Sequence, residues 1–262
     1  MTRLPTLFVS HGSPMMAIEH DATTDVWVRL GRELPRPKSI LIASAHWATR
    51  TPTTLAAKQP ETIHDFYGFP EPLYRLRYPS PGAPELAARA CELISAAGLP
   101  AAMDRERGLD HGAWAPLRYM YPDADLPVTQ VSLQSPQSMA HHLQLGRALA
   151  PLADEGVLVI GSGNLTHNLR DGFSASPGSA PFPYALEFQA WMKAHLEAND
   201  FDTLVDYRRR APHAARAHPT DEHLAPLYVA LGAAGEKVRS ECLYDGYTMG
   251  ALAMDIWLFH PA

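Results

Sequence analysis

Three histidines of the sequence each stand at or near the end of an apolar run. His11 follows TLFVS, His46 follows SILIASA, and His167 comes shortly after GVLVIGS. In open α/β sheets, ligands bind beyond the carboxyl ends of the strands, so parallel strands would bring these imidazoles to one edge of a sheet. Neutral nitrogen ligands around an open position suit Fe(II), Zn or Ni. The pattern therefore predicts a metalloenzyme that is either oxygen-using or hydrolytic.

Two further histidines lie in segments with local structural signals. In HPTDEHLAPL, Pro219 and Thr220 predict a helix start, with Thr220 as the N-cap and His223 in the first turn. The positive end of a helix favours a neutral imidazole, which is the form that binds metal. His111, in GLDHGAWAPL, is expected in a glycine-bounded turn. The residue pattern alone leaves a structural role open for both histidines.

The other histidines carry weaker signals. His64 belongs to the aromatic segment TIHDFYGFP, which could line a pocket or only pack against the core. Asp65, Phe66, Tyr67 and Phe69 of the same segment could shape such a pocket. The remaining histidines lie on helical or tail segments and are interpreted as surface or capping residues: His20, His141, His142, His195, His213, His218 and His260.

The elements that would position these residues are typical of an α/β protein. Four segments are predicted as strands, at 6–10, 39–45, 127–133 and 156–162. Three of them are nearly continuous apolar runs, which suggests strands that are covered on both faces. Helical patterns lie at 84–98, 138–156 and 184–200. Pro151 is expected to break or kink the second helix. We therefore predict a single domain, residues 1–262, with a central mixed or parallel sheet flanked by helices on both faces.

The composition argues against several classes of protein. The chain has 262 residues, of which 46% are hydrophobic, enough for a sizeable core. The net charge of −6 argues against a nucleic-acid partner. We see neither a signal peptide nor an apolar run near the roughly 20 residues of a membrane span, so no membrane partner is expected. Cys91 and Cys242 form no CxxC pair and suggest a reducing compartment, which predicts a cytoplasmic protein.

Several long motifs together resemble one enzyme family. LFVSHGSPM, SAHW, TIHDFYGFPEPLY, LDHGAWAPLRYMYPDADLPVTQVSL, SGNLTHNLR and EHLAPL are similar to segments of the class III extradiol ring-cleavage dioxygenases, and most of all to the DOPA 4,5-dioxygenase-like branch. The resemblance implies a non-haem Fe(II) site that opens the ring of a catechol with O2 to give a muconic semialdehyde. The implied partners are thus a small-molecule catechol and O2.

The resemblance also implies a set of metal ligands. His11 and His46 match two ligands of the family. The third ligand is a glutamate in one branch, whereas in the DOPA-like branch the position resembles a histidine, here His223. The neighbouring Glu222 keeps a carboxylate ligand open. His167 could serve as a fourth ligand.

Further residues are assigned to catalysis and substrate binding by the same resemblance. His167 resembles the acid/base of the family, and His111 resembles a second acid/base that contacts the substrate. From the aromatic segment, His64 and Tyr67 are expected to bind the substrate.

Alternatives remain at this stage. Three neutral histidines could readily hold Zn(II), so Fe(II) is expected as the working metal while Zn(II) could be the metal that is bound. The same cluster would also suit a zinc-dependent hydrolase. A non-catalytic metal- or partner-binding member of the fold is a third option. The sequence is compatible with a monomer or a homodimer and does not identify the catechol.

Overall fold

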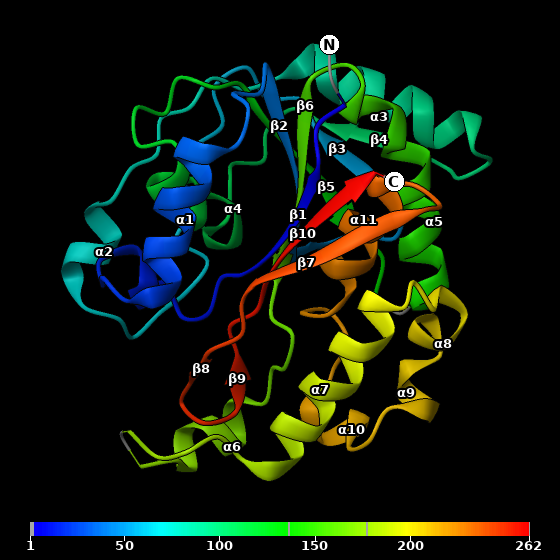
Figure 1. Ribbon diagram of the computed structural model, residues 1–262. Helices are drawn as coiled ribbons and strands as arrows, with labels where there is room; N and C mark the ends of the chain where they lie inside the picture. The colour runs from blue at the N-terminus through cyan, green and yellow to red at the C-terminus, as the bar shows by residue number, and fades with distance from the viewer. Residues whose placement is uncertain (1–2, 136, 177, 262) are drawn as a thin grey trace.

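The four apolar runs form the centre of one sheet. In the computed structural model, which describes residues 3–135, 137–176 and 178–261, eight strands follow the order β4-β3-β5-β2-β6-β1-β10-β7 (Figure 1). The predicted strands are β1 (Thr6–Ser10), β2 (Ser39–Ala48), β5 (Val128–Leu133) and β6 (Val157–Gly163). Neighbours among these four pair in parallel. Their carboxyl ends therefore share one edge of the sheet, as predicted.

Four further strands complete the sheet on both sides. These are β3 (Thr53–Leu55), β4 (Ala102–Asp104), β7 (Val238–Tyr244) and β10 (Ile256–Pro261), and a separate hairpin consists of β8 (Tyr247–Thr248) and β9 (Leu252–Ala253). Strand β10 pairs antiparallel with β1 and β7, and β3 pairs antiparallel with β5. The sheet is therefore mixed.

Helices cover both faces of the sheet. On one side lie α1 (Ala22–Glu33), α2 (Glu71–Arg75) and α4 (His111–Met120); on the other lie α3 (Pro84–Ala96), α5 (Met139–Leu149), α7 (Pro183–Glu197) and α11 (Ala225–Ala234) (Figure 1). The remaining helices are short: α6 (Leu169–Ser174), α8 (Phe201–Val205), α9 (Tyr207–Arg210) and α10 (Ala214–Ala217), with 3₁₀ turns at Pro14–Ala17 and Ala150–Ala153. The predicted α/β layering is confirmed.

Two apolar cores explain the unbroken hydrophobic runs of the strands. Successive side chains of a strand point to opposite faces. Leu7 and Val9 accordingly pack into the core beneath α1 and α4, whereas Phe8 packs into the core beneath α5 and α11. Because both faces are covered, each position of these strands favours an apolar residue.

Each predicted helix is present in the structure, but the residues at which it begins or ends differ from the prediction. The segment 138–156 forms α5 and then a 3₁₀ turn over Ala150–Ala153. Pro151 lies in that turn, where its missing N–H ends the α-helical hydrogen bonding. Among the described residues, no helix has both the length and the apolar character that a membrane crossing requires.

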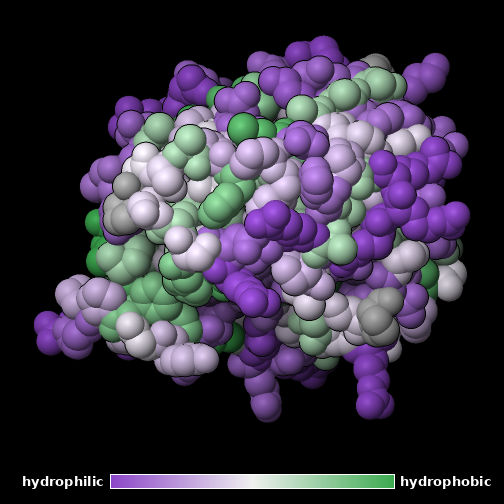
Figure 2. Space-filling model, turned by 90° about the horizontal axis from the view of Figure 1, so that it is seen from below, coloured by the Kyte–Doolittle hydropathy of each residue, from purple (hydrophilic) through white to green (hydrophobic). Residues whose placement is uncertain are grey.

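The end of the molecule with α6 and the β8–β9 hairpin carries a surface groove. This end is at the bottom of Figure 1 and faces the viewer in Figure 2, where hydrophobic residues gather on one side of a largely hydrophilic surface. The groove has a volume of about 720 Å³, and Phe173, Tyr247 and Met249 are among the residues that line it. Phe173 itself is 75% exposed. Since α6 starts just after His167, the groove adjoins a segment that bears a candidate site residue.

Candidate metal centre

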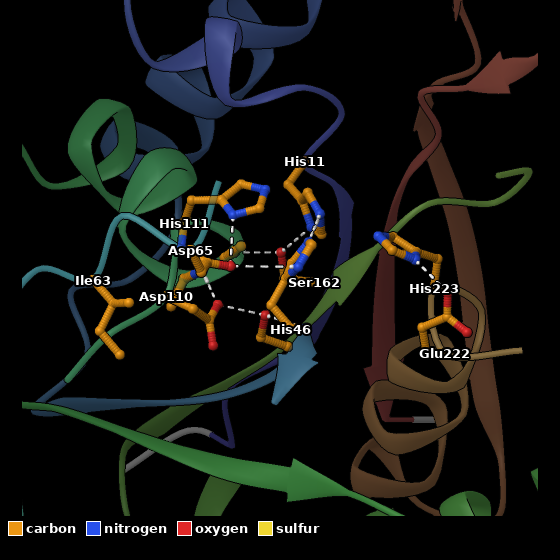
Figure 3. Close-up of polar contacts among 12 residues, drawn as sticks. His11, His46, Ile63, Asp65, Asp110, His111, Ser162, Glu222 and His223 are labelled. Atoms are coloured by element: carbon orange, nitrogen blue, oxygen red, sulfur yellow. Dashed lines mark hydrogen bonds and ion pairs between the residues drawn. The ribbon is translucent and has the colours of Figure 1, made fainter. Parts of the chain in front are cut away.

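Three histidines from separate elements converge at the carboxyl edge of the sheet. His11 directly follows β1, His46 lies near the end of β2, and His223 lies in the turn before α11. One potential ligand atom from each lies within 4.8 Å of the other two. Nε2 of His11 is 2.9 Å from Nε2 of His46 (Figure 3). The structure thus brings together the three residues that the sequence proposed as ligands.

The ring of His11 is oriented by a serine on β6. Its Nδ1 lies 3.0 Å from Oγ of Ser162, and that hydroxyl donates to the carbonyl of Gly112 at 2.5 Å. Because the hydroxyl donates its only proton to the carbonyl, Oγ of Ser162 accepts a hydrogen bond from Nδ1–H of His11. Nε2 of His11 is therefore left with a free lone pair that faces His46.

Glu222 holds His223 from behind. Nδ1 of His223 lies 3.2 Å from Oε1 of Glu222, so Nε2 is again the free nitrogen. The carboxylate of Glu222 groups with His223 and His167 and not with His11 and His46. In this geometry His223 faces the other two histidines, and Glu222 acts as its hydrogen-bond acceptor.

The predicted helix start at Thr220 is wrong. Helix α11 begins at Ala225 with Pro226 in its first turn, and its N-cap makes no side-chain hydrogen bond. The carbonyl of Asp221 accepts the N–H groups of Leu224 and Ala225 and so closes a separate turn. His223 lies in this turn, and burial favours its neutral form.

His46 and His111 share one carboxylate. Nδ1 of His111 is 2.9 Å from Oδ2 of Asp65, and Nδ1 of His46 is 3.4 Å from the same oxygen (Figure 3). His111 opens α4, where Asp110 is the N-cap, so the expected glycine-bounded turn is in fact a helix start. Asp110 is fully buried and accepts hydrogen bonds from Ser44 and Gln130. Helix α4 is thereby fixed against the end of β2.

Gly112 allows α4 to approach the histidines. A Cβ atom at this position would lie 2.5 Å from Oγ of Ser44 and 3.2 Å from ring carbons of both His11 and His46. No side chain fits there unless these residues shift. Neither Gly112 nor Ser162 was predicted as a site residue, although each stands in or beside a motif that carries a candidate histidine.

His167 lies beside the group of three histidines. Its ring stacks on that of His223 with 3.5 Å between the centroids and 7° between the planes. It groups with Glu222 and His223, and the structure does not bring it together with His11 and His46. The arrangement therefore places His167 next to the candidate metal position, and its role as a possible fourth ligand stays a prediction.

The two predicted substrate contacts lie in different surroundings. The ring of His64 is 5.8 Å from Phe66 and 5.9 Å from Trp114, and Phe66 lies edge-on to His111 at 5.7 Å. His64 is thus separated from His111 by one aromatic ring. Tyr67 is 91% exposed, so the structure places it at the surface and not among the histidines.

Two histidines outside this site were misinterpreted as surface or capping residues. His142 and His218 are 2% and 0% exposed. His142 bonds to the carbonyl of Ser138 and to the N–H of Gln134, while His218 donates to the carbonyl of Leu165. Both therefore act as hydrogen-bonded core residues.

Burial keeps the converging imidazoles neutral. It lowers the pKa values of His11 and His223 well below the ordinary value, and that of His46 to about 4. Burial also lowers the pKa of His167 to about 4. These neutral nitrogens are the form that binds a metal ion.

The carboxylates behind the imidazoles stay charged. Burial on its own would raise the pKa of Asp65, but hydrogen bonds from His111 outweigh it and bring the pKa to about 2. The hydrogen bond with His223 lowers the pKa of Glu222 to about 2. The bare Nε2 atoms of His11 and His46 face each other at 2.9 Å, and a carboxylate lies behind the rings of His46 and His223. This arrangement fits a divalent cation between the imidazoles.

Comparisons with known proteins identify the family of the chain. Residues 5–254 match the family described as catalytic LigB subunit of aromatic ring-opening dioxygenase. The chain is 43% identical over 258 residues to a 4,5-DOPA dioxygenase extradiol of Beta vulgaris, covering 97% of this chain and 96% of that protein. It is also 43% identical over 257 residues to a protein of the same name from Escherichia coli K12, covering 97% and 93%.

A solved structure shows the same fold. The crystal structure of an uncharacterized protein, JW3007, from Escherichia coli K12 superposes with a TM-score of 0.83 at 37% sequence identity. The match covers 98% of this chain and 99% of the other. The likeness therefore extends over the whole architecture, including the strands that carry the histidines.

Proposed function

Because this chain belongs to the family of the catalytic LigB subunit of aromatic ring-opening dioxygenases, we propose that it cleaves a DOPA-like catechol at the three-histidine site. It is an extradiol dioxygenase and hence an oxidoreductase, which uses a small-molecule substrate and O2. The proposed product is a muconic semialdehyde. The observation that carries the proposal is the convergence of three imidazoles, each with Nδ1 facing an oxygen acceptor. The comparisons do not favour the zinc hydrolase or the non-catalytic alternative.

We assign His11, His46 and His223 as the metal ligands, with Fe(II) as the working metal. Three neutral nitrogens suit Fe(II) and also Zn(II), so a purified sample could carry Zn(II). When bound, the metal ion would act as a Lewis acid that lowers the pKa of the catechol hydroxyls, and it would bring catechol and O2 together. The residues of the chain then handle the protons.

His111 is the proposed base. Its Nδ1 is engaged by Asp65, which leaves Nε2 free to accept the proton of the second catechol hydroxyl. His167, held by its stack on His223, is neutral before substrate binds. As the proposed acid, it first takes a proton from the substrate and later returns it to the departing oxygen. Each such role is typically worth about 10²–10⁴ in rate.

The aromatic segment beside His111 supports a substrate with an aromatic ring. The ring of Phe66 packs edge-on against that of His111, and the ring of His64 packs edge-on against that of Phe66. We therefore keep His64 as a substrate contact near the ring. The exposed Tyr67 is proposed to contact the part of the substrate that projects toward solvent. The relatives named for 4,5-DOPA make a DOPA-like catechol the first compound to test.

A cytoplasmic site of action is part of the proposal. Cys91 and Cys242 are both free thiols, and this fits a reducing compartment.

The decisive experiment loads the metal-free protein anaerobically with Fe(II) and adds air and a series of catechols, L-DOPA among them. We expect a yellow product and the consumption of one O2 per catechol. A Zn(II)-loaded sample serves as the control and should consume no O2. If the protein binds Fe(II) but consumes O2 with none of the catechols, the proposed function is wrong. Ester or amide hydrolysis by the Zn(II) sample would revive the hydrolase alternative.

A further inference from the structure

One carboxylate contacts both a proposed metal ligand and the proposed base. Oδ1 of Asp65 accepts the backbone N–H of His111 at 2.8 Å. Oδ2 lies 2.9 Å from Nδ1 of His111 and 3.4 Å from Nδ1 of His46, and Figure 3 shows dashed lines from Asp65 to both rings. Asp65 thus lies between two residues that have different roles.

An ionised carboxylate can only accept hydrogen bonds, so it selects the imidazole tautomer with the proton on Nδ1. We propose that Asp65 is a positioning residue that holds His111 and His46 in this same tautomer, so that one carboxylate prepares both the base and a metal ligand. The roles of the two histidines rest on the proposed function, but the tautomers do not. The shorter contact is with His111, so the effect on His111 should be the stronger.

The surroundings keep Asp65 in place. Its side chain is 20% exposed, and its Oδ1 is bound by the first N–H of α4, at the positive end of that ten-residue helix. The next residue, Phe66, packs edge-on against the ring of His111. The carboxylate and the ring of His111 therefore have little freedom to separate.

The hydrogen bonds of Asp65 determine how the isosteric change Asp65→Asn would affect the two imidazoles. In Asp65→Asn, the backbone N–H of His111 can only donate, so the amide carbonyl must replace Oδ1. The amide NH₂ then takes the position of Oδ2 and donates toward Nδ1 of His111 and His46. A nitrogen that accepts this bond carries no proton, so the proton of the ring moves to Nε2. The variant should therefore invert the tautomer while the shape of the side chain stays the same.

The test uses protein labelled with ¹⁵N at histidine and long-range ¹H–¹⁵N spectra, with His111 and His46 assigned by single substitutions. In the unsubstituted protein, His111 should carry its proton on Nδ1 both without metal and with diamagnetic Zn(II). His46 should do so in the Zn(II) form. In Asp65→Asn, His111 should carry its proton on Nε2. Affinity for Zn(II) should fall about 10–100-fold, as is usual when a residue that orients a metal ligand is changed.

Two variants serve as comparisons. Asp104→Asn removes another carboxylate whose Oδ1 accepts two backbone N–H groups, those of Glu106 and Arg107, and it should leave both tautomers unchanged. Asp65→Glu retains an acceptor and should restore the Nδ1 proton of His111 in part. A structural role of Asp65 alone would predict no such rescue and no tautomer change.

The proposal is overturned if His111 of the unsubstituted protein carries its proton on Nε2. It is also overturned if Asp65→Asn folds and keeps the original tautomer. The first measurement needs no variant, so a misfolded Asp65→Asn cannot hide the answer. Neither measurement uses a catechol. The tautomers of His111 and His46 can therefore be tested even if the protein cleaves no catechol ring.

Discussion

The imidazole of His167 lies parallel to that of His223, with 3.5 Å between the centroids and 7° between the planes. The stack places a candidate proton donor directly beside a candidate metal ligand. It also orients His167 by contact with the face of its ring, so the position of the ring does not depend on its nitrogens.

This relationship gives a first prediction for His167→Phe. Phenylalanine can keep the stack but cannot carry a proton. We expect bound metal to stay near one ion per chain and turnover of catechol to fall by about 10²–10⁴. Elemental analysis and O2 consumption measure the two quantities. Loss of the metal from this variant would show that His167 is a ligand after all.

The second prediction separates a ligand from its hydrogen-bond acceptor. His223→Ala should reduce bound metal to well below one ion per chain because it removes a ligand. Glu222→Gln should weaken binding only about 10–100-fold, since it alters the group that orients the ring. Metal titration measures both, and His20→Ala, a change on an exposed histidine, is the control. The reverse order of the two effects would make Glu222 the third ligand.

Gly112→Ala tests the close approach of α4 in a third prediction. The added methyl group would lie 2.5 Å from Oγ of Ser44 and would press on the rings of His11 and His46. We expect a fall of roughly 10–100-fold in metal affinity in a protein that remains folded. The double change with Ser44→Ala removes the nearest atom and should recover part of the affinity. Ser44→Ala alone is the control, and unchanged affinity in Gly112→Ala would contradict the predicted crowding.

The sequence predicts the central strands and the histidines that follow them because both have local signatures. Leu7, Phe8 and Val9 are apolar in succession since both faces of β1 are covered. The parallel pairing of β1 with β6 then brings His11 and Ser162 together. The alternation of strands and helices suggests parallel neighbours, but it does not give the strand order.

The remaining features depend on contacts between distant residues. The pairing of His111 with Asp65 joins α4 to a loop that is distant in sequence, and no local pattern marks it. His218 is buried because Leu165 offers it a carbonyl, which composition cannot reveal. Strands β3 and β4 have three residues each, too few to show an alternation.

The fourth prediction concerns stability and pH. Asp255, between β9 and β10, is fully buried, and burial raises its pKa to about 7. Its two carboxyl oxygens accept hydrogen bonds from Gln189 and Trp257. Because the pKa is higher in the folded protein than in the unfolded chain, folding favours the protonated form. This contribution to stability is complete below about pH 4 and is lost as the pH rises through about 7.

Asp255→Asn should remove this pH dependence because the amide does not titrate. Above pH 7 the ionised carboxylate costs the unsubstituted protein at most about 4 kcal/mol of unfolding free energy, so the variant should gain relative to it as the pH rises from about 5 to about 8. Urea unfolding at the two pH values measures the change. Asp123→Asn is the matched control, since Asp123 is exposed in the segment that follows α4. If the unsubstituted protein and Asp255→Asn show the same pH dependence, Asp255 does not titrate in this range and its burial is compensated by Gln189 and Trp257.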